Sequence, residues 1–359
     1  MTQREQEILR LIENDPMIAQ QAIADILGIT RSSVAVHISN LTKKGYIAGK
    51  GYVLRPAAYA VVVGGVNVDI GGRSFSPLKA EDSNPGKVSV SMGGVGRNIA
   101  HNLSLMGVDV RMLTAYGDDT HGQEVATSCA KAGIDLSNAL KLPGETTSTY
   151  LYLTDETGEM ALAVSDMAIC NRITPEYLAE NLSLLQNAQV VIADTNIPAE
   201  SLRYLAEICQ RPLFVDPVST AKAEKLRPIL HRIHTLKPNR MEAELLSGVP
   251  IRSREDAQAA ARLLLEKGVK RVFLSMGSEG MLAATEEETY LLDNLPGHMV
   301  NTTGCGDAAM AALVWAWLEE KNTKDSALAG LAAGAIAMES AQTINPAMSA
   351  EALAARMYR

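Results

Sequence analysis

The sequence has few of the residues that build metal clusters, disulfide frameworks or membrane spans. Its four cysteines lie far apart and include no C-x-x-C pair, so neither a cysteine-bound metal nor a set of disulfides is expected. No apolar stretch approaches the roughly 18 residues of a transmembrane helix. The N-terminus is charged and lacks the apolar core of a signal peptide. These absences predict a protein of the reducing cytoplasm without a membrane partner.

Aromatic residues are also scarce, at 4% of the 359 residues. Hydrophobic residues nevertheless make up 47% of the chain, so a large core must be built mainly from aliphatic side chains and methionine. The length suggests about two domains. The net charge of −8 argues against a nucleic-acid surface over the whole chain, although a small basic module could exist within it.

The first 56 residues form such a module. They carry seven lysines and arginines against five acidic residues, a net charge of +2 in a chain whose remainder is −10. Apolar periodicity predicts three helices, the third running from an N-cap at Thr30 to a stop at Gly45. Two short strands around Gly49-Lys50-Gly51 would follow as a hairpin. This is the pattern of a winged helix-turn-helix, which makes DNA a candidate partner of residues 1–56.

The third helix would enter the major groove of DNA. A protein-interaction domain whose basic residues are merely solvated is the alternative, because helix-turn-helix patterns are short and degenerate. The side chains expected to contact bases, phosphates or the backbone are Arg31, Ser32, Ser33, His37, Asn40, Lys43 and Lys44.

From residue 57 to residue 359 the pattern changes to alternating strands and helices. Continuous apolar runs such as "YAVVVGG" and "AQVVIADTN" are typical of buried parallel strands. The alternation predicts an α/β domain with a mostly parallel sheet and helices on both faces. The segment 146–166 reads instead as a hairpin, which is either a lid over a site or an edge extension of the sheet.

Polar residues gather where the predicted strands end, and open α/β sheets bind ligands at that edge. They are Asn67, Asp69, Asp194, Asn196, Asp216, Lys237, Asn239, Ser275 and Gly277. A dinucleotide fingerprint is incomplete, because Ile99 stands where the third glycine of G-x-G-x-x-G would be. No Walker A loop or G-x-S-x-G elbow is present. The histidines have no metal-ligand spacing.

The stretch "NTTGCGDAAMAAL" places two glycines and Asp307 at the start of an apolar helix. Taken alone, Asp307 reads as a residue that stabilises the helix N-terminus. The same free N–H groups could instead bind an anion, with the carboxylate beside it for chemistry.

Five motifs occur in order: "GGVNVD", "GGVGRN", "KPNRMEAE", "SMGSEG" and "NTTGCGDAAMAAL". From about Tyr59 to the end, the chain resembles the ribokinase-like, phosphofructokinase-B (PfkB) family of carbohydrate kinases, and most closely its pseudouridine-kinase branch. The N-terminal helix-turn-helix is an addition to that pattern. The resemblance implies a ribokinase-like fold with a small β lid, formed by residues of about 73–91 and 146–166. It also implies ATP as co-substrate, Mg²⁺ as cofactor, and a nucleoside or small sugar as acceptor.

The resemblance further implies the catalytic residues. Asp307 matches the base that takes the proton of the acceptor hydroxyl. Gly304, Cys305 and Gly306 match the anion hole, whose backbone N–H groups face the transferring phosphoryl group. The family commonly has alanine at Cys305, where we expect a small buried side chain rather than a reactive thiol.

Binding residues follow from the same match. Those implied for the sugar are Asp69, Gly93, Gly94 and Asn98, with Asn67 and Asn196 as weaker candidates. Those expected to read a nucleobase from the lid are Ser83, Asn84, Lys87 and Asp166. Those implied for the nucleotide are Asn239, Ser275, Gly277 and Gly280.

Asn239 and Glu242 match an N-x-x-E motif that organises Mg²⁺ through water. The alternative is a loop asparagine followed by a surface glutamate. Many family members bind a monovalent cation close to the positions of Thr302 and Thr303. Asn301 stands where those members often carry aspartate, which speaks against K⁺ dependence.

Two functions remain open. The first is a kinase of the 5′-hydroxyl of a nucleoside, with pseudouridine as the preferred substrate, and the second is a transcription regulator that senses its ligand. Retention of Asp307, the glycines and the N-x-x-E motif favours a working enzyme. A homodimer is one candidate assembly.

Overall fold

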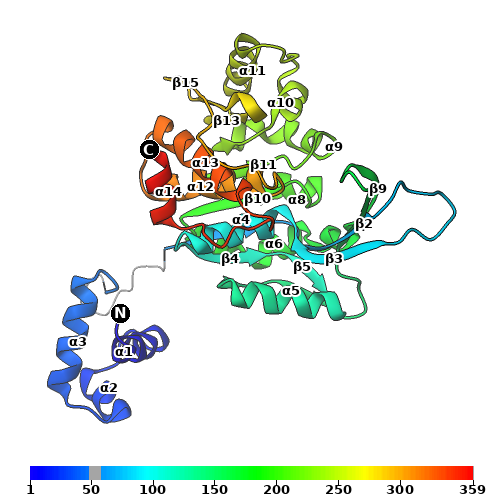
Figure 1. Ribbon diagram of the computed structural model, residues 1–359. Coiled ribbons are helices and arrows are strands. Elements are labelled where there is room, and N and C mark those ends of the chain that lie inside the picture. The colour runs from blue at the N-terminus through cyan, green and yellow to red at the C-terminus, as the bar shows by residue number, and fades with distance from the viewer. Residues whose placement is uncertain (48–57, 359) are drawn as a thin grey trace. The chain divides into compact units, whose positions relative to one another are not determined.

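The computed structural model describes residues 1–47 and 58–358, and the chain divides into two compact units, Met1–Ala58 and Tyr59–Arg359 (Figure 1). The predicted hairpin around Gly49-Lys50-Gly51 lies outside the described residues. None of the helices in the described part of the chain has the length and hydropathy that crossing a bilayer requires.

The small unit contains the three predicted helices, α1 (Gln3–Asn14), α2 (Gln20–Leu27) and α3 (Arg31–Lys43). Local signals set their ends. Gly28 adopts a left-handed φ of 63° at the end of α2, and the hydroxyl of Thr30 accepts the N–H of Ser33 at the start of α3. The core is aliphatic and consists of Ile8, Ile12, Ile23, Ala24, Val34, Ile38, Leu41 and Ile47.

A nine-stranded sheet forms the centre of the large unit, in the order β15-β14-β13-β12-β11-β10-β1-β4-β6. From β13 to β6 neighbouring strands are parallel, and β14 and β15 add an antiparallel edge, so the prediction of a mostly parallel sheet is confirmed. The strands are β1 (Tyr59–Val63), β4 (Asp109–Leu113), β6 (Ile134–Asp135), β10 (Val190–Asp194), β11 (Leu213–Asp216), β12 (Thr235–Leu236), β13 (Arg271–Ser275), β14 (Met281–Ala284) and β15 (Thr289–Leu292).

Helices cover both faces of this sheet. Successive strand residues point to opposite faces, so Val62 belongs to one core and Val61 to the other. The first core includes residues of α4 (Val95–Leu105), α5 (Thr120–Lys131), α12 (Cys305–Leu318), α13 (Thr323–Met338) and α14 (Ala350–Met357). The second includes residues of α6 (Pro175–Glu180), α7 (Leu182–Asn187), α8 (Ala199–Ile208), α9 (Thr220–Ala223), α10 (Arg240–Ser247) and α11 (Arg254–Glu266).

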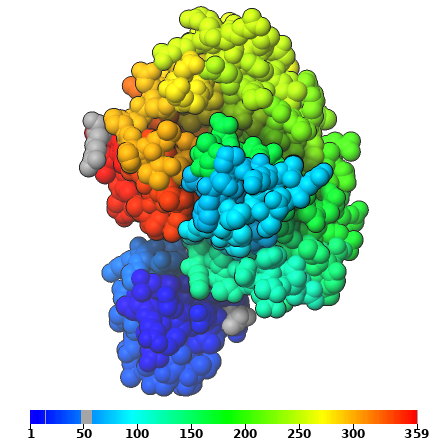
Figure 2. All heavy atoms as spheres, turned by 45° about the vertical axis from the view of Figure 1, so that its right-hand side comes forward, coloured from blue at the N-terminus to red at the C-terminus, as the bar shows by residue number. Residues whose placement is uncertain are grey.

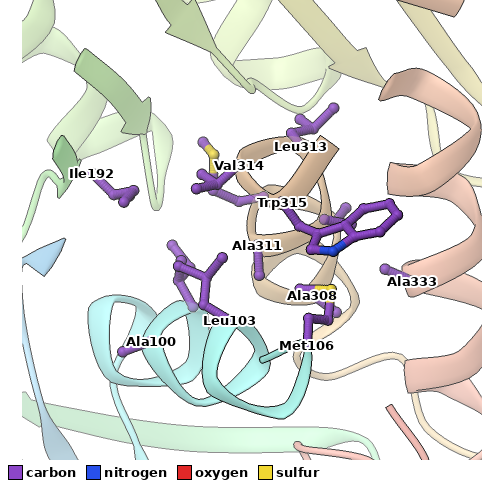
Figure 3. Packing of buried hydrophobic residues seen from close by; sticks show 14 of the residues in the cluster. Ala100, Leu103, Met106, Ile192, Ala308, Ala311, Leu313, Val314, Trp315 and Ala333 are labelled. Atoms are coloured by element: carbon purple, nitrogen blue, oxygen red, sulfur yellow. The ribbon is translucent and has the colours of Figure 1, made fainter. Parts of the chain in front are cut away.

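Alanines let the helices of the first core approach one another closely. Figure 3 shows Leu103 of α4 and Met106, which follows this helix, beside Ala308 and Ala311 of α12, with Ala333 of α13 on the other side. Small side chains allow backbones to come near without leaving voids. This packing explains how a chain poor in aromatic residues still builds a large core.

A separate sheet of four strands, β3-β2-β8-β9, lies next to the large one. Its strands are β2 (Asn67–Ser74), β3 (Gly86–Gly93), β8 (Thr149–Thr154) and β9 (Met160–Asp166). The predicted hairpin 146–166 supplies β8 and β9, and β8 pairs with β2 rather than with any strand of the large sheet. The edge-extension alternative is therefore wrong. In Figure 2 the light blue β2 and β3 segment and the green hairpin form adjacent surface.

Candidate active site

The N-terminus of α12 is open toward a cleft. Gly304 precedes the helix with a left-handed φ of 85°, and a Cβ at this position would come within 2.4 Å of the carbonyl oxygen of Thr343. Only glycine suits this turn. In the described part of the chain no side chain caps the first N–H groups of α12. The N–H of Cys305 donates to the carbonyl oxygen of Thr302 at 3.3 Å, but no partner is seen in the described residues for the N–H groups of Gly306 and Asp307, so these two can bind an anion.

Asp307 does not cap its own helix. Its Oδ2 accepts a hydrogen bond from Nδ2 of Asn98 in the first turn of α4, at 2.9 Å. This contact contradicts the simple capping interpretation. It also brings together two predicted site residues that are 209 positions apart in the sequence.

The Asp307 carboxyl is partly open to solvent but closely surrounded by protein atoms. Burial and the nearby charge of Asp216 raise its pKa to about 7. The hydrogen bond from Asn98 and the charge of Lys237 act in the opposite direction, and Asp194 adds a further upward push. A carboxylate with such a pKa can accept a proton near neutral pH.

Lys237 supplies the positive charge of this site. Its buried ammonium group lies 3.1 Å from Oδ2 of Asp216. Burial acts to lower the pKa of Lys237, but Asp216 overcomes that effect and the net shift is upward, so the side chain stays protonated. A Cβ on Gly306 would lie 3.5 Å from this ammonium, which places the charge beside the first turn of α12. From the sequence, Asp216 and Lys237 are predicted only to be polar residues at the ends of strands.

Asp69 and its neighbours form a second cluster on β2 and β3. Nδ2 of Asn67 donates to Oδ1 of Asp69 at 2.6 Å. Gly93 leaves room for the carboxylate, since a Cβ there would come within 2.3 Å of Oδ2. Burial raises the pKa of Asp69, while Asn67 and Arg97 oppose the shift. Asn67 and Asp69 come after β1 in the chain, as the sequence predicts, and they lie on strand β2 of the small sheet.

Asp194 ties together the segments around this cluster. The carboxylate is fully buried and accepts the backbone N–H groups of Gly65, Gly96 and Asn196, at 2.9, 2.8 and 2.8 Å. Gly65 follows β1, Gly96 lies in the first turn of α4, and Asn196 follows β10. Sequence reasoning assigned no role to Asp194, and its position at a strand end was the only signal.

Asn196 is held more firmly than a turn residue would be. It is buried, and Oδ1 of its amide accepts a hydrogen bond from Nζ of Lys222 at 2.6 Å. Because an ammonium group only donates, the amide nitrogen of Asn196 must point away from it. A Cβ on Gly65 would lie 3.1 Å from that nitrogen.

A cleft of about 770 Å³ adjoins the N-terminus of α12. The predicted nucleotide residues Asn239, Ser275, Gly277 and Gly280 all line it. Cys305 and Gly306 of the predicted anion hole line it as well, so the structure brings the two groups together. Apolar side chains make up much of the remaining wall, namely Met241, Met276, Met281, Leu295, Met299, Ala309, Leu331, Ala335 and Met338.

The N-x-x-E motif forms a capping box at the start of α10. The amide oxygen of Asn239 accepts the N–H of Glu242 at 3.0 Å, and the Glu242 carboxylate accepts the N–H of Asn239 at 2.8 Å. Glu242 is buried, which excludes the alternative of a surface glutamate. Burial also raises its pKa.

The charges of this region suit a divalent cation held through water. Asp216, Glu242 and Asp307 act on the single buried ammonium of Lys237. Added positive charge would relieve this excess of carboxylates. Within the described residues no group of three His, Cys, Asp or Glu side chains is arranged to hold a metal directly. The arrangement therefore fits the water-mediated role better than direct ligation.

Asp166 lies away from the other predicted substrate residues. Strand register pairs it with Thr149, which pairs in turn with Val68. Asp69 instead shares a face with Ser91 and Tyr150. Asp166 is thus on the opposite face of the small sheet from Asp69, and its contact with the substrate stays a prediction.

The other predicted lid residues differ in exposure and in whether their polar groups already have hydrogen-bond partners. Lys87 and Ser83 are exposed, and the register places Lys87 on the Asp69 face. The amide of Asn84 is already bonded to the backbone of Lys79. In the segment before α12, the amide oxygen of Asn301 accepts the N–H of Thr303 at 3.0 Å.

In the small unit, the predicted DNA-contacting residues are only partly free. Arg31, Ser32 and Lys43 are exposed on α3. Lys44 instead pairs with the buried carboxylate of Glu5 at 2.7 Å, which lowers the pKa of Glu5 and fixes α1 to α3. The hydroxyl of Ser33 contacts that of Thr30 at 2.9 Å, and His37 is half-buried.

Comparison with known proteins agrees with this architecture. The profile of the pfkB family carbohydrate kinases matches residues 57–350, and that of a winged helix-turn-helix DNA-binding family matches residues 1–48. The chain is 40% identical over 353 residues to the uncharacterized sugar kinase YeiI of Escherichia coli K12, which covers 98% of both chains. It is 41% identical over 298 residues to the pseudouridine kinase of the same strain, covering 82% of this chain and 95% of that enzyme.

A solved structure shows the same fold. The carbohydrate kinase from Agrobacterium tumefaciens superposes with a TM-score of 0.73 at 27% identity, over 84% of this chain and 97% of that one. The sequence-based prediction of a ribokinase-like α/β fold is confirmed, as is the N-terminal helix-turn-helix pattern.

Proposed function

The chain belongs to the pfkB family of carbohydrate kinases, and from this premise we propose that it transfers the γ-phosphoryl group of ATP to the 5′-hydroxyl of a nucleoside, with pseudouridine as the substrate. The observation that carries the proposal is the Asp307 carboxylate, turned away from its own helix toward Asn98, beside free N–H groups. The similarity to pseudouridine kinase supports the choice of acceptor.

In this mechanism Asp307 accepts the proton of the attacking hydroxyl as its oxygen bonds to phosphorus. Phosphoryl transfer passes through a loose transition state, so correct position matters more than strong basicity. A pKa of about 7 leaves a large fraction of the carboxylate ionised at neutral pH. The hydrogen bond from Asn98 directs it.

The N–H groups at the start of α12 and the ammonium of Lys237 stabilise the negative charge of the transferring group. Backbone groups fixed by Gly304 and Gly306 need no reorganisation during the reaction. Lys237 is held in place by its ion pair with Asp216. Bound Mg²⁺ would supply further neutralisation of the phosphates, with Asn239 and Glu242 holding its water ligands.

The acceptor binds between the small sheet and the N-terminus of α4. Asp69 accepts hydrogen bonds from ribose hydroxyls, and Asn67 keeps its carboxylate in position. Gly93 and Gly94 allow the backbone to approach the sugar, and Asn98 is hydrogen-bonded to Asp307. The small sheet closes over the sugar and excludes water, which would otherwise compete as acceptor. Lys87 and Ser83 are the remaining candidates to read the base.

A panel of acceptors tests the substrate. Purified protein is incubated with MgATP and pseudouridine, uridine, guanosine, inosine, ribose or fructose, and products are identified by mass spectrometry. We expect phosphorylation of pseudouridine at the highest kcat/KM. Phosphorylation of ribose or fructose, with no turnover of any nucleoside, would overturn the assignment of the acceptor. Removal of divalent cations by EDTA should abolish turnover, and added Mg²⁺ should restore it.

A second function is supported by the small unit. Its match to a DNA-binding family and the exposed Arg31, Ser32 and Lys43 favour DNA contact, and the proposal is a kinase that also binds DNA. The fluorescence anisotropy of a labelled random-sequence duplex would measure affinity with and without pseudouridine. Binding should weaken steeply as salt rises. A salt-independent signal would favour a protein-interaction domain.

The small sheet offers a surface for a second copy of the chain. Register places Val90, Leu151 and Val164 in one row and Val88, Leu153 and Leu162 in the next, all on the face opposite Asp69. Each of these six side chains is exposed. A contiguous apolar patch of this kind marks an interface, and we propose a homodimer formed through it.

Size-exclusion chromatography with light scattering tests the dimer. Leu162→Lys should give a monomer, whereas Tyr358→Lys, a similar change at the exposed end of α14, should leave the dimer unchanged. A monomeric wild-type protein would contradict the proposal.

We also propose that this ATP-dependent enzyme acts in the cytoplasm.

A further inference from the structure

We propose that Arg97 is a positioning residue, which fixes the amide of Asn98 so that this amide donates to Asp307. The inference rests on the proposed role of Asp307 as the base. Arg97 precedes Asn98 on α4, and its guanidinium donates to Oδ1 of Asn98 and to Oγ of Ser128. The mechanism described above does not use it.

Arg97 is a buried cation without a close anionic partner. Its side chain is 5% exposed, and among the described residues it forms no ion pair with a carboxylate. Its Nε has no hydrogen-bond partner. Burial lowers its pKa, and the neighbouring Cys129 opposes this shift, as does the more distant charge of Asp69. A buried unpaired charge is unfavourable for stability, so packing alone gives no reason for arginine here.

The hydrogen bonds of Arg97 define which way the Asn98 amide faces. One terminal nitrogen donates to Oγ of Ser128 at 2.9 Å, and the other to Oδ1 of Asn98 at 3.3 Å. A guanidinium has donors only, so it must face the amide oxygen. The Nδ2 group of Asn98 is thereby directed to Oδ2 of Asp307, at 2.9 Å.

Several charged or titratable groups surround Asp307 and Arg97. Asp307 faces Asp216 and Asp194, which raise its pKa, and Lys237 and the Asn98 amide, which lower it. Beside Arg97 lie Asp69 and two groups that burial keeps neutral. They are Cys129, whose pKa is raised, and His101, whose pKa is lowered to about 4. Neither of these groups changes charge between pH 6 and pH 8.

Loss of the guanidinium would free the Asn98 amide to rotate. Its oxygen could then face Asp307 and accept a hydrogen bond from the protonated carboxyl, which favours the inactive form of the base. Activity would fall at low pH and recover at high pH. A variant that is merely misfolded would show no such recovery.

The test compares the pH dependence of kcat for wild type, Arg97→Met and Ser128→Ala. In Arg97→Met the acidic limb should move up by about one pH unit, which gives roughly an eightfold loss at pH 6.5 and near-normal turnover at pH 9. Ser128→Ala removes one guanidinium contact but leaves those with Asn98 and with the carbonyl oxygen of Met92, so its acidic limb should stay in place. Asn98→Ala should shift the limb, and adding Arg97→Met to it should cause no further shift.

An equal loss of turnover at every pH, or additive shifts in the double variant, would overturn the inference. A second measurement does not require turnover. The difference in melting temperature between Asp307→Asn and its parent stops growing with pH at the folded-state pKa of Asp307, and Arg97→Met should raise the pH of this plateau. An unchanged plateau pH refutes the role of Arg97. Absence of nucleoside turnover in the wild type refutes the proposed function instead.

Discussion

Two helices of the large unit carry an acidic residue at the third position and use it in opposite ways. In α10, Glu242 bonds back to the N-cap residue Asn239, and the pair closes the helix end. In α12 the N-cap is Gly304, which has no side chain to reciprocate, and Asp307 turns to Asn98 on another helix. The first helix is closed by its own residues and the second is left open. One glycine therefore frees both the N–H groups and the carboxylate for chemistry.

Replacement of the free carboxylate should have the largest effect. Asp307→Asn keeps the size of the side chain but removes the base, so kcat should fall by about a hundredfold to ten-thousandfold. Pseudouridine should still bind, because the Asp69 cluster is unchanged. Steady-state kinetics and titration calorimetry measure the two quantities. Turnover within tenfold of the wild type would show that Asp307 is not the base.

Glu242, whose carboxylate takes part in the capping box of α10, allows a structural role to be distinguished from a functional one. Glu242→Gln preserves the capping box, since glutamine also accepts at that position, but removes the charge next to the cleft. We expect kcat/KM for MgATP to fall by about tenfold to a hundredfold, with a higher requirement for Mg²⁺.

A matched control is available in α11, where Ser253 and Asp256 form the same kind of box. Asp256 is half-buried and does not line the cleft, so Asp256→Asn should change the melting temperature slightly and leave the kinetics unaltered. Equal effects of the two substitutions on kcat/KM would make Glu242 a purely structural residue.

The raised pKa of Asp307 also predicts a cost in stability. An acid whose pKa is about 7 in the folded protein and near 4 in the unfolded chain destabilises the fold when ionised. The penalty is absent below pH 4, grows up to pH 7 and is complete above it. Asp307→Asn should therefore raise the free energy of unfolding at pH 8 by about 2 kcal/mol, and have little effect at pH 4. Thermal denaturation at both pH values measures this, and an equal gain at pH 4 would contradict the shift.

Local pattern was enough to predict the helix ends and the parallel strands. Caps such as Thr30 act within one turn, and buried strands are marked by continuous apolar runs. Strand β2 was not predicted, because it contains Gly71 and Gly72, and glycine has a low strand propensity. The face occupied by Asp166 depends on pairing with β8, and a shift of one residue in register exchanges the faces.

The site residues could be predicted individually but not their contacts. Asn98 and Asp307 are 209 positions apart, and only the fold brings them together. The same holds for Lys44 and Glu5, which are 39 positions apart in the small unit. A sequence shows which side chains could act near a strand end. It does not show which of them already have partners, and this decides whether a lysine is free to contact DNA.

A third helix start, that of α9, extends the comparison to backbone strain. At α12 the left-handed residue before the helix is a glycine, but before α9 it is Val218, with φ of 65°. A β-branched side chain is strained in this region, whereas asparagine tolerates it. Val218→Asn should therefore raise the free energy of unfolding by about 0.5–1 kcal/mol, measured by chemical denaturation. A loss of stability would show that the contacts of the half-buried valine outweigh the strain of its backbone.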